Sequence, residues 1–218
     1  MGIPPATRDY RTLIAAASLI VGPLLMTIGD LFHPEERMDT AEQIAIIVDH
    51  ASHWYAAHLL LFIGMLLSIP GLLALASLTA ARKPAAGYAA RILILIGAAA
   101  FAAIFVGEML IGRFVADGAD SAAATALLDS MFSGPIVAAV IPAALAFFVG
   151  TAAFAIPLMM AGGKLRWVAV FYSIGALLIL AEILSAQVIL SQIGNLLIFC
   201  GGATTAWLIL RGETGVVS

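Results

Sequence analysis

Charge is the scarcest property of this sequence. Asp, Glu, Lys and Arg make up only 11% of its 218 residues, whereas 63% are hydrophobic. A water-soluble domain covers its surface with polar side chains, and this composition does not supply enough of them. The few charges also stand in short groups between long apolar runs. The composition therefore excludes a soluble globular domain and indicates a chain whose solvent is largely lipid.

Cysteine is almost absent as well, and basic residues do not predominate. The one cysteine, Cys200, lies inside an apolar run and cannot support a disulfide framework within the chain. The formal net charge of −3 gives no basic footprint, which excludes a nucleic-acid partner. No His-Glu-x-x-His motif or other catalytic signature fixes an activity.

Six apolar runs dominate what is present, and each is about long enough to cross ~30 Å of hydrocarbon as a helix. They are continuous and rich in Ala and Leu, whereas membrane β-strands alternate in polarity. We therefore predict an all-α, polytopic transmembrane bundle of six helices that forms a single domain over residues 1–218. The predicted spans are 12–32, 55–80, 88–112, 134–161, 167–187 and 190–210.

Two connections carry the signature of short amphipathic helices. In 39–49, Asp39 or Thr40 can cap a helix, Thr40 and Gln43 have capping-box spacing, and Ile44, Ile47 and Val48 share one face. The connection 120–129 repeats the plan of Asp, then Ser or Thr, then a small apolar helix that ends in Asp. This similarity suggests a parallel internal repeat of 12–80 and 88–161, followed by the hairpin 167–210.

The distribution of Lys and Arg predicts the orientation. If the six spans alternate, eight of the ten Lys and Arg residues fall on one side and only Arg37 and Arg113 on the other. By the positive-inside rule, we expect a multi-pass protein of the plasma (inner) membrane with both termini cytoplasmic and the two short helices outside. Aromatic residues at the ends of spans are expected to form the usual interfacial belt: Trp54, Tyr55, Tyr88 and Trp167.

Polar residues inside the spans are the candidates for function, because they are costly in lipid and usually face the interior of a bundle. Asp30, His58, Glu108 and Glu182 come from four spans and lie at a similar depth near the outer end. We expect them to converge in one outer cavity with His33 and Arg113 at its rim. Gln187, Gln192 and Asn195 continue this polar band.

Imidazole and carboxylate together are ordinary ligands of a divalent metal such as zinc, iron or manganese. The sequence thus allows a metal site of Asp30, His33, His58, Glu108 and Glu182. A structural role stays open beside it, with Asp30 paired to Arg113 and the glutamates hydrogen-bonded across helices. A proton or cation path is the third alternative. Haem is less favoured, because the last four spans contain no histidine.

A resemblance to a known group rests on two patches. One is Asp39-Thr40-Ala41, which opens the first outer helix, and the other is the turn and basic-Trp pair within Leu158–Val170. With the six-helix layout, these resemble a broad group of bacterial integral membrane proteins of unknown function. The resemblance implies the topology and carries no activity, substrate or site.

Three interpretations of function therefore stay open. The first is an outward-facing metal or redox site, with lipid or quinone chemistry as one form of it. The second is a small proton- or cation-coupled transporter. The third is an accessory or scaffold subunit of a larger membrane complex. Membrane lipid is the expected partner in each case, and a homo-oligomer is compatible with all three.

Overall fold

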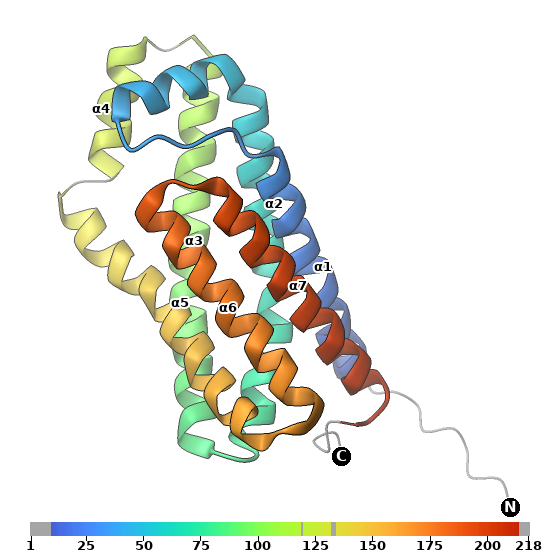
Figure 1. Cartoon of the computed structure of the whole chain (residues 1–218). Coiled ribbons are helices and arrows are strands. Elements are labelled where there is room, and N and C mark those ends of the chain that lie inside the picture. Colours follow the sequence, from blue (N-terminus) through green and yellow to red (C-terminus); the bar gives the residue numbers. More distant parts are fainter. Residues whose placement is uncertain (1–9, 119, 132–133, 214–218) are drawn as a thin grey trace, which may run out of the picture.

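The computed structural model describes residues 10–118, 120–131 and 134–213, and these residues form helices without a strand (Figure 1). All helices except α4 are long and apolar enough to cross a membrane by length and composition. The predicted class, a transmembrane bundle of six helices with short accessory helices, is thereby confirmed. The helices are α1 (Tyr10–Phe32), α2 (Thr40–Ala80), α3 (Pro84–Ala116), α4 (Ser121–Met131), α5 (Gly134–Ala161), α6 (Gly163–Ser185) and α7 (Val188–Leu210).

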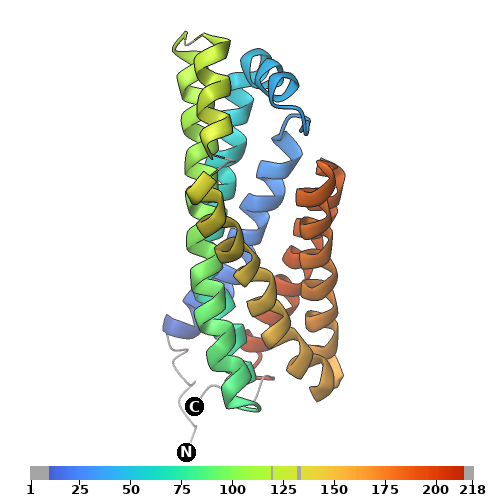
Figure 2. The ribbon, with the colours of Figure 1, turned by 90° about the vertical axis from the view of Figure 1, so that its left-hand side faces the viewer.

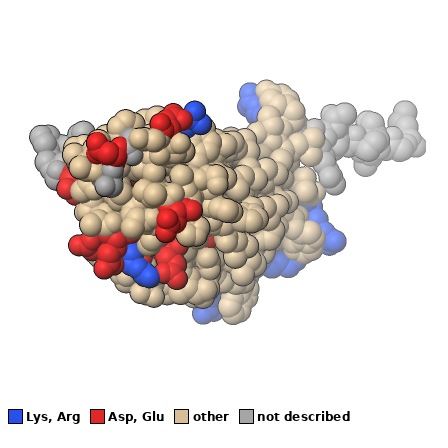
Figure 3. Space-filling view, turned by 90° about the horizontal axis from the view of Figure 1, so that it is seen from above, with Lys and Arg blue, Asp and Glu red and all other residues tan. Residues whose placement is uncertain are grey.

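Acidic side chains gather at one end of the bundle. α1 begins and α7 ends at one end, and α4 lies at the other, which we call the α4 end (Figure 1). Seen from the α4 end, Asp and Glu side chains gather on the surface (Figure 3). The exposed carboxyl groups there are those of Glu35, Asp39, Glu42, Asp49, Asp117, Asp120 and Asp129.

Both predicted short helices are present. The side chain of Asp39 accepts hydrogen bonds from the backbone N–H groups of Ala41 and Glu42, each at 3.0 Å, so Asp39 is the cap of α2. The first stretch of α2 runs to a kink at His50 (φ −129°, ψ 27°), where the direction changes into the span. Asp120 accepts from the N–H of Ala123 at 2.7 Å and starts α4 in the same way.

These two short helices cover part of the α4 end of the bundle, where α4 packs against α2, α3 and α5. The hydroxyl of Thr40 donates to the carboxylate of Asp129 at 3.0 Å and ties them together. Beneath them lies a small apolar core, whereas Val48, expected on the same face, is exposed. The core consists of Ile44, Ile47, Trp54, Ile111, Val115, Ala124 and Leu128.

The spans pack closely where small residues meet. A Cβ atom on Gly22 of α1 would lie 2.6 Å from the backbone nitrogen of Ser68 in α2, so glycine is what lets these helices touch. α5 and α6 contact each other near the end opposite α4, where the rings of Phe154 and Tyr172 are 5.3 Å apart. Toward the α4 end the two helices diverge (Figure 2). This divergence leaves room for the cavity described next.

Candidate functional site

A cavity of about 520 Å³ opens at the α4 end and reaches into the middle of the bundle. Ligand pockets commonly occupy roughly 300–1,000 Å³, so this one is large enough for a small organic molecule. Its deepest lining residues include Ser18 of α1, Leu72 of α2 and Tyr172 of α6. Each of these lies about two helical turns from the opposite end of its helix, so the cavity opens toward one end of the bundle only.

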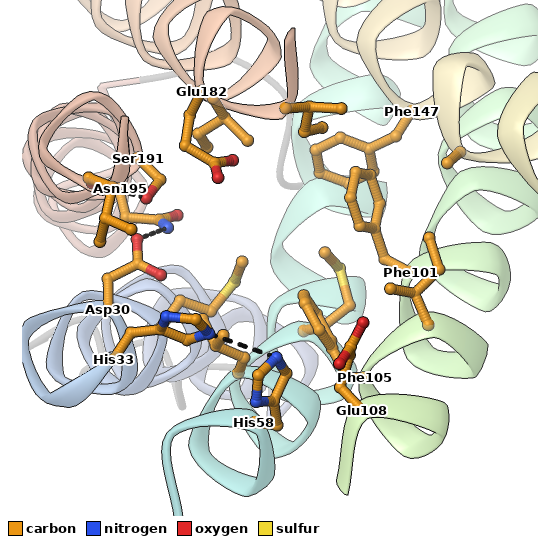
Figure 4. Close-up of a pocket in the computed structure, with 18 of the residues that line it drawn as sticks. Asp30, His33, His58, Phe101, Phe105, Glu108, Phe147, Glu182, Ser191 and Asn195 are labelled. Atoms are coloured by element: carbon orange, nitrogen blue, oxygen red, sulfur yellow. Dashed lines mark hydrogen bonds between the residues drawn. The ribbon is translucent and has the colours of Figure 1, made fainter. Parts of the chain in front are cut away.

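The structure brings all five sequence-predicted site residues to this one cavity. Asp30, His58, Glu108 and Glu182 come from α1, α2, α3 and α6, and His33 follows α1. Figure 4 shows them around a common space, with the carboxyl group of Glu182 pointing into it. The expected convergence of the four spans is therefore present. Their role as metal ligands stays a prediction.

Asp30 is held by α7. The side-chain amide of Asn195 donates to Asp30 Oδ2 at 2.6 Å, and that of Gln192 donates to the backbone oxygen of Asp30 at 3.0 Å. Both Asp30 and Asn195 are buried. The sequence placed Gln192 and Asn195 in the polar band, and the structure shows that they connect α7 to the end of α1.

His33 and His58 form an imidazole pair. The two Nε2 atoms are 3.3 Å apart, and the ring centroids are 4.7 Å apart (Figure 4). The Nδ1 atom of His33 lies 2.7 Å from the backbone oxygen of Pro34, and that of His58 lies 2.9 Å from the backbone oxygen of Trp54. A carbonyl oxygen only accepts hydrogen bonds, so each Nδ1 carries the hydrogen and donates it.

Glu36 completes this part of the site and was missed by sequence reasoning. Its Oε1 atom is 3.6 Å from His33 Nε2, and its side chain lines the cavity. The spacing of three residues from His33 was the available signal. It was weak because this connection has no predictable helical geometry, and the structure places it outside α1 and α2.

Several buried polar atoms at this cavity have no hydrogen-bond partner. Five buried side-chain nitrogen or oxygen atoms among the described residues lack one, and four of them belong to residues that line the cavity. Buried polar groups are normally paired, so such a concentration calls for an explanation. The four atoms are Gln43 Nε2, Glu108 Oε2, Tyr172 OH and Asn195 Oδ1.

The deeper wall of the cavity is apolar and aromatic. Phe101 contacts Phe105, Phe147 and Phe148 through its ring, with centroid distances of 6.0, 5.7 and 5.9 Å. Aliphatic and thioether side chains extend this wall. They are those of Met26, Leu61, Met65, Leu72, Ile104, Ala144 and Ile198. The cavity is therefore amphipathic, with a polar end near α4 and an apolar interior.

The cavity also reaches the side of the bundle between α5 and α6. Ile141 and Leu145 of α5 and Ile183 of α6 line the cavity and are at the same time exposed on the surface. They lie on the stretches where the two helices diverge (Figure 2). These apolar residues border the cavity on the side where α5 and α6 diverge.

Two residues lie elsewhere than predicted. Arg113, expected at the rim, has an exposed side chain that forms an ion pair with Asp117 at 2.8 Å, because it occupies the outer face of the last turn of α3. Trp54, expected in the interfacial belt, is only 3% exposed and donates from Nε1 to the backbone oxygen of Glu108 at 3.0 Å. Tyr55, Tyr88 and Trp167 are exposed as a belt requires.

Among the described residues, no group of three or more His, Cys, Asp or Glu side chains is arranged to hold a metal ion. The expectation of a metal site thus finds no support in this side-chain arrangement. Comparison of the chain with protein-family models, curated proteins and solved structures finds no match. Function is therefore inferred from the geometry and chemistry of the cavity.

Proposed function

We propose that this multi-pass membrane protein binds an amphiphilic molecule of the bilayer in the cavity at the α4 end. The observation that carries this proposal is the amphipathic character of that cavity. Its polar end presents carboxyl, imidazole and amide groups from several helices, and its interior is lined by Phe, Met and Leu. A lipid-like molecule has the same division into a polar head and an apolar tail.

The position of the opening supports the same proposal. Ile141, Leu145 and Ile183 border an apolar passage between two spans, so a membrane molecule could reach the cavity without leaving hydrocarbon. The positive-inside rule would place the α4 end on the outer side of the plasma membrane. The ligand would then come from the outer leaflet. Transport across the membrane is less well supported, because the residues that line the cavity stop about two helical turns short of the opposite end of the bundle.

A metal or redox cofactor at the same residues is the competing proposal. The imidazole pair favours it, because both Nδ1 atoms donate to carbonyl oxygens, which is how metal-binding imidazoles are commonly oriented. Elemental analysis of the protein purified without chelators tests it. A stoichiometric divalent ion that is lost in His58→Ala would favour the cofactor.

The amphiphile proposal is tested by filling the cavity. Ala144 of α5 lines the cavity, whereas Ala152 of the same helix is exposed and does not. Native mass spectrometry of the protein extracted in mild detergent should show a retained amphiphile in the wild type and in Ala152→Phe. The adduct should be lost in Ala144→Phe, because the new ring occupies its volume.

Folding of the variants is checked by thermal unfolding, and Ala144→Leu serves as a milder substitution if Ala144→Phe does not fold. An adduct retained in a folded Ala144→Leu or Ala144→Phe protein would contradict the proposal, as would a wild-type protein that carries none.

A further inference from the structure

The geometry points to an amphiphile whose head group is a hydrogen-bond-donating cation, such as a primary ammonium group. This inference rests on the proposed function and specifies the class of its ligand. It comes from the imidazole pair, the unpaired acceptors and the carboxyl groups of the polar end.

The imidazole pair supplies the first part of the argument. Because the Nδ1 atoms of His33 and His58 donate to carbonyl oxygens, the Nε2 atom of each neutral ring carries a lone pair. The two Nε2 atoms lie 3.3 Å apart, and Glu36 Oε1 is 3.6 Å from His33 Nε2. Lone pairs that face one another at these distances need a hydrogen between them, which is supplied either by a proton on one imidazole or by an N–H donor of a bound head group.

The unpaired atoms supply the second part. Glu108 Oε2 and Asn195 Oδ1 are both acceptors, both buried and both without a partner. The amide of Asn195 is fixed in this orientation because its nitrogen donates to Asp30. The exception in the polar end is Gln43 Nε2, a donor near the α4 end. The side chains of Glu108 and Asn195 line the cavity, so a small adjustment would turn these acceptors toward a head group that offers several N–H donors, whereas a phosphate or carboxylate offers them none.

Charge supplies the third part. Among the described residues, the cavity is lined by five carboxyl side chains and by one Lys or Arg residue, Arg37, whose guanidinium is paired with Glu35. The carboxyl groups are those of Asp30, Glu36, Glu108, Asp129 and Glu182. Carboxyl groups buried near an apolar wall are costly as anions, and a cation that binds among them stabilises their ionised form. The site is thus complementary to a positively charged head.

Trp54 provides a reporter inside the site, since its ring lies 4.6 Å from that of His58. Trp167 and Trp207 are exposed on α6 and α7, so Trp167→Phe and Trp207→Phe leave Trp54 as the only tryptophan of the chain. The protein is placed in phosphatidylcholine nanodiscs, whose choline heads have no N–H donors. Nitroxide-labelled octadecylamine, octadecanol and octadecanoate then differ only in their heads, and quenching of Trp54 measures their binding.

We expect the amine to bind about tenfold more tightly than the alcohol, since hydrogen bonds to charged groups are the stronger ones, and the carboxylate to bind most weakly. Glu108→Gln should lower the affinity for the amine by about tenfold and change that for the alcohol little. The control is Glu42→Gln, because Glu42 is exposed at the same end of the molecule and does not line the cavity. It should leave both affinities unchanged.

Equal binding of amine and alcohol would overturn the head-group inference and leave the amphiphile proposal standing. Absence of saturable quenching by all three compounds would overturn both. If zinc chloride binds stoichiometrically through His33 and His58 and the amine shows no preference over the alcohol, the positive charge at this site is a metal ion and the inference is wrong.

Discussion

The contact between Asp30 and Asn195 offers a quantitative test of how the polar end is held together. Asn195 Nδ2 and Asp30 Oδ2 are 2.6 Å apart, and both residues are buried where α1 meets α7. Hydrogen bonds to charged groups contribute about 1.5–3 kcal/mol in proteins, whereas side-chain hydrogen bonds between membrane helices average about 0.6 and reach about 1.7 kcal/mol. The short distance and deep burial place this contact near the upper membrane value.

We therefore expect a coupling energy of about 1.5 kcal/mol in a double-mutant cycle of Asp30→Ala and Asn195→Ala. Reversible unfolding in mixed micelles with increasing sodium dodecyl sulfate gives the free energies. The control cycle combines Asp30→Ala with Thr205→Ala. The hydroxyl of Thr205 is buried in α7 but donates to its own helix at Gly201, so those two changes should add. A coupling energy below about 0.5 kcal/mol for Asp30 and Asn195 would refute the reasoning, because that is within the error of additivity.

Two further predictions concern packing and orientation. Gly97→Ala should destabilise the protein by about 1–2 kcal/mol, measured as a lower unfolding temperature, because the added Cβ would lie 2.4 Å from the backbone nitrogen of Phe147. This overpacking outweighs the gain of about 0.5–1 kcal/mol in helix propensity that alanine brings. A more stable variant would show that α3 and α5 can move apart. Because we expect the C-terminus to be cytoplasmic, alkaline phosphatase fused after Ser218 should be inactive and a cytoplasmic reporter fused at the same place should be active. The reverse result would contradict the prediction that both termini are cytoplasmic.

The six spans could be predicted because each is specified locally. A continuous apolar run of about 20 residues has one stable form in lipid, a helix, whatever its neighbours do. The internal prolines did not mislead this prediction, since α1, α2 and α5 continue through Pro23, Pro70, Pro142 and Pro157. The caps at Asp39 and Asp120 were equally local, and both short helices begin where these residues predict.

The sequence could not predict which side chains at the ends of the spans face the interior, because this depends on how each helix is rotated about its axis relative to its neighbours. Trp54 and Tyr55 are neighbours with similar expected roles, yet Trp54 faces the carbonyl group of Glu108 while Tyr55 is exposed. Arg113 is close in sequence to Glu108, but one points out of the bundle and the other lines the cavity. The proposed parallel repeat stays a prediction.

Only one part of the cavity could be predicted from the sequence, because the other part depends on the rotation and divergence of the helices. Its polar end could be anticipated, because charged residues in a span are rare and conspicuous. Its apolar interior could not be anticipated, because the sequence does not distinguish Phe101 and Phe147 from other lipid-facing or core residues. They line a cavity only because α5 diverges from α6 in the folded bundle. The amphipathic character that supports the proposed function is thus a property of the tertiary arrangement.

The unpaired polar atoms are the feature that distinguishes the proposed ligand site from a purely structural polar cluster. A buried polar atom without a partner costs about 1–3 kcal/mol, and four such atoms belong to residues that line this cavity. Replacing them with apolar side chains of similar size would make a more stable bundle, as it often does for buried polar groups. Asp30 accepts hydrogen bonds from the side chains of Asn195 and Gln192, so a structural role accounts for it. Glu108 Oε2 and Asn195 Oδ1 have no donor, so a structural role does not account for them. Under the proposed function, a ligand that pairs with these two acceptors removes this cost, so we expect its binding to raise the free energy of unfolding.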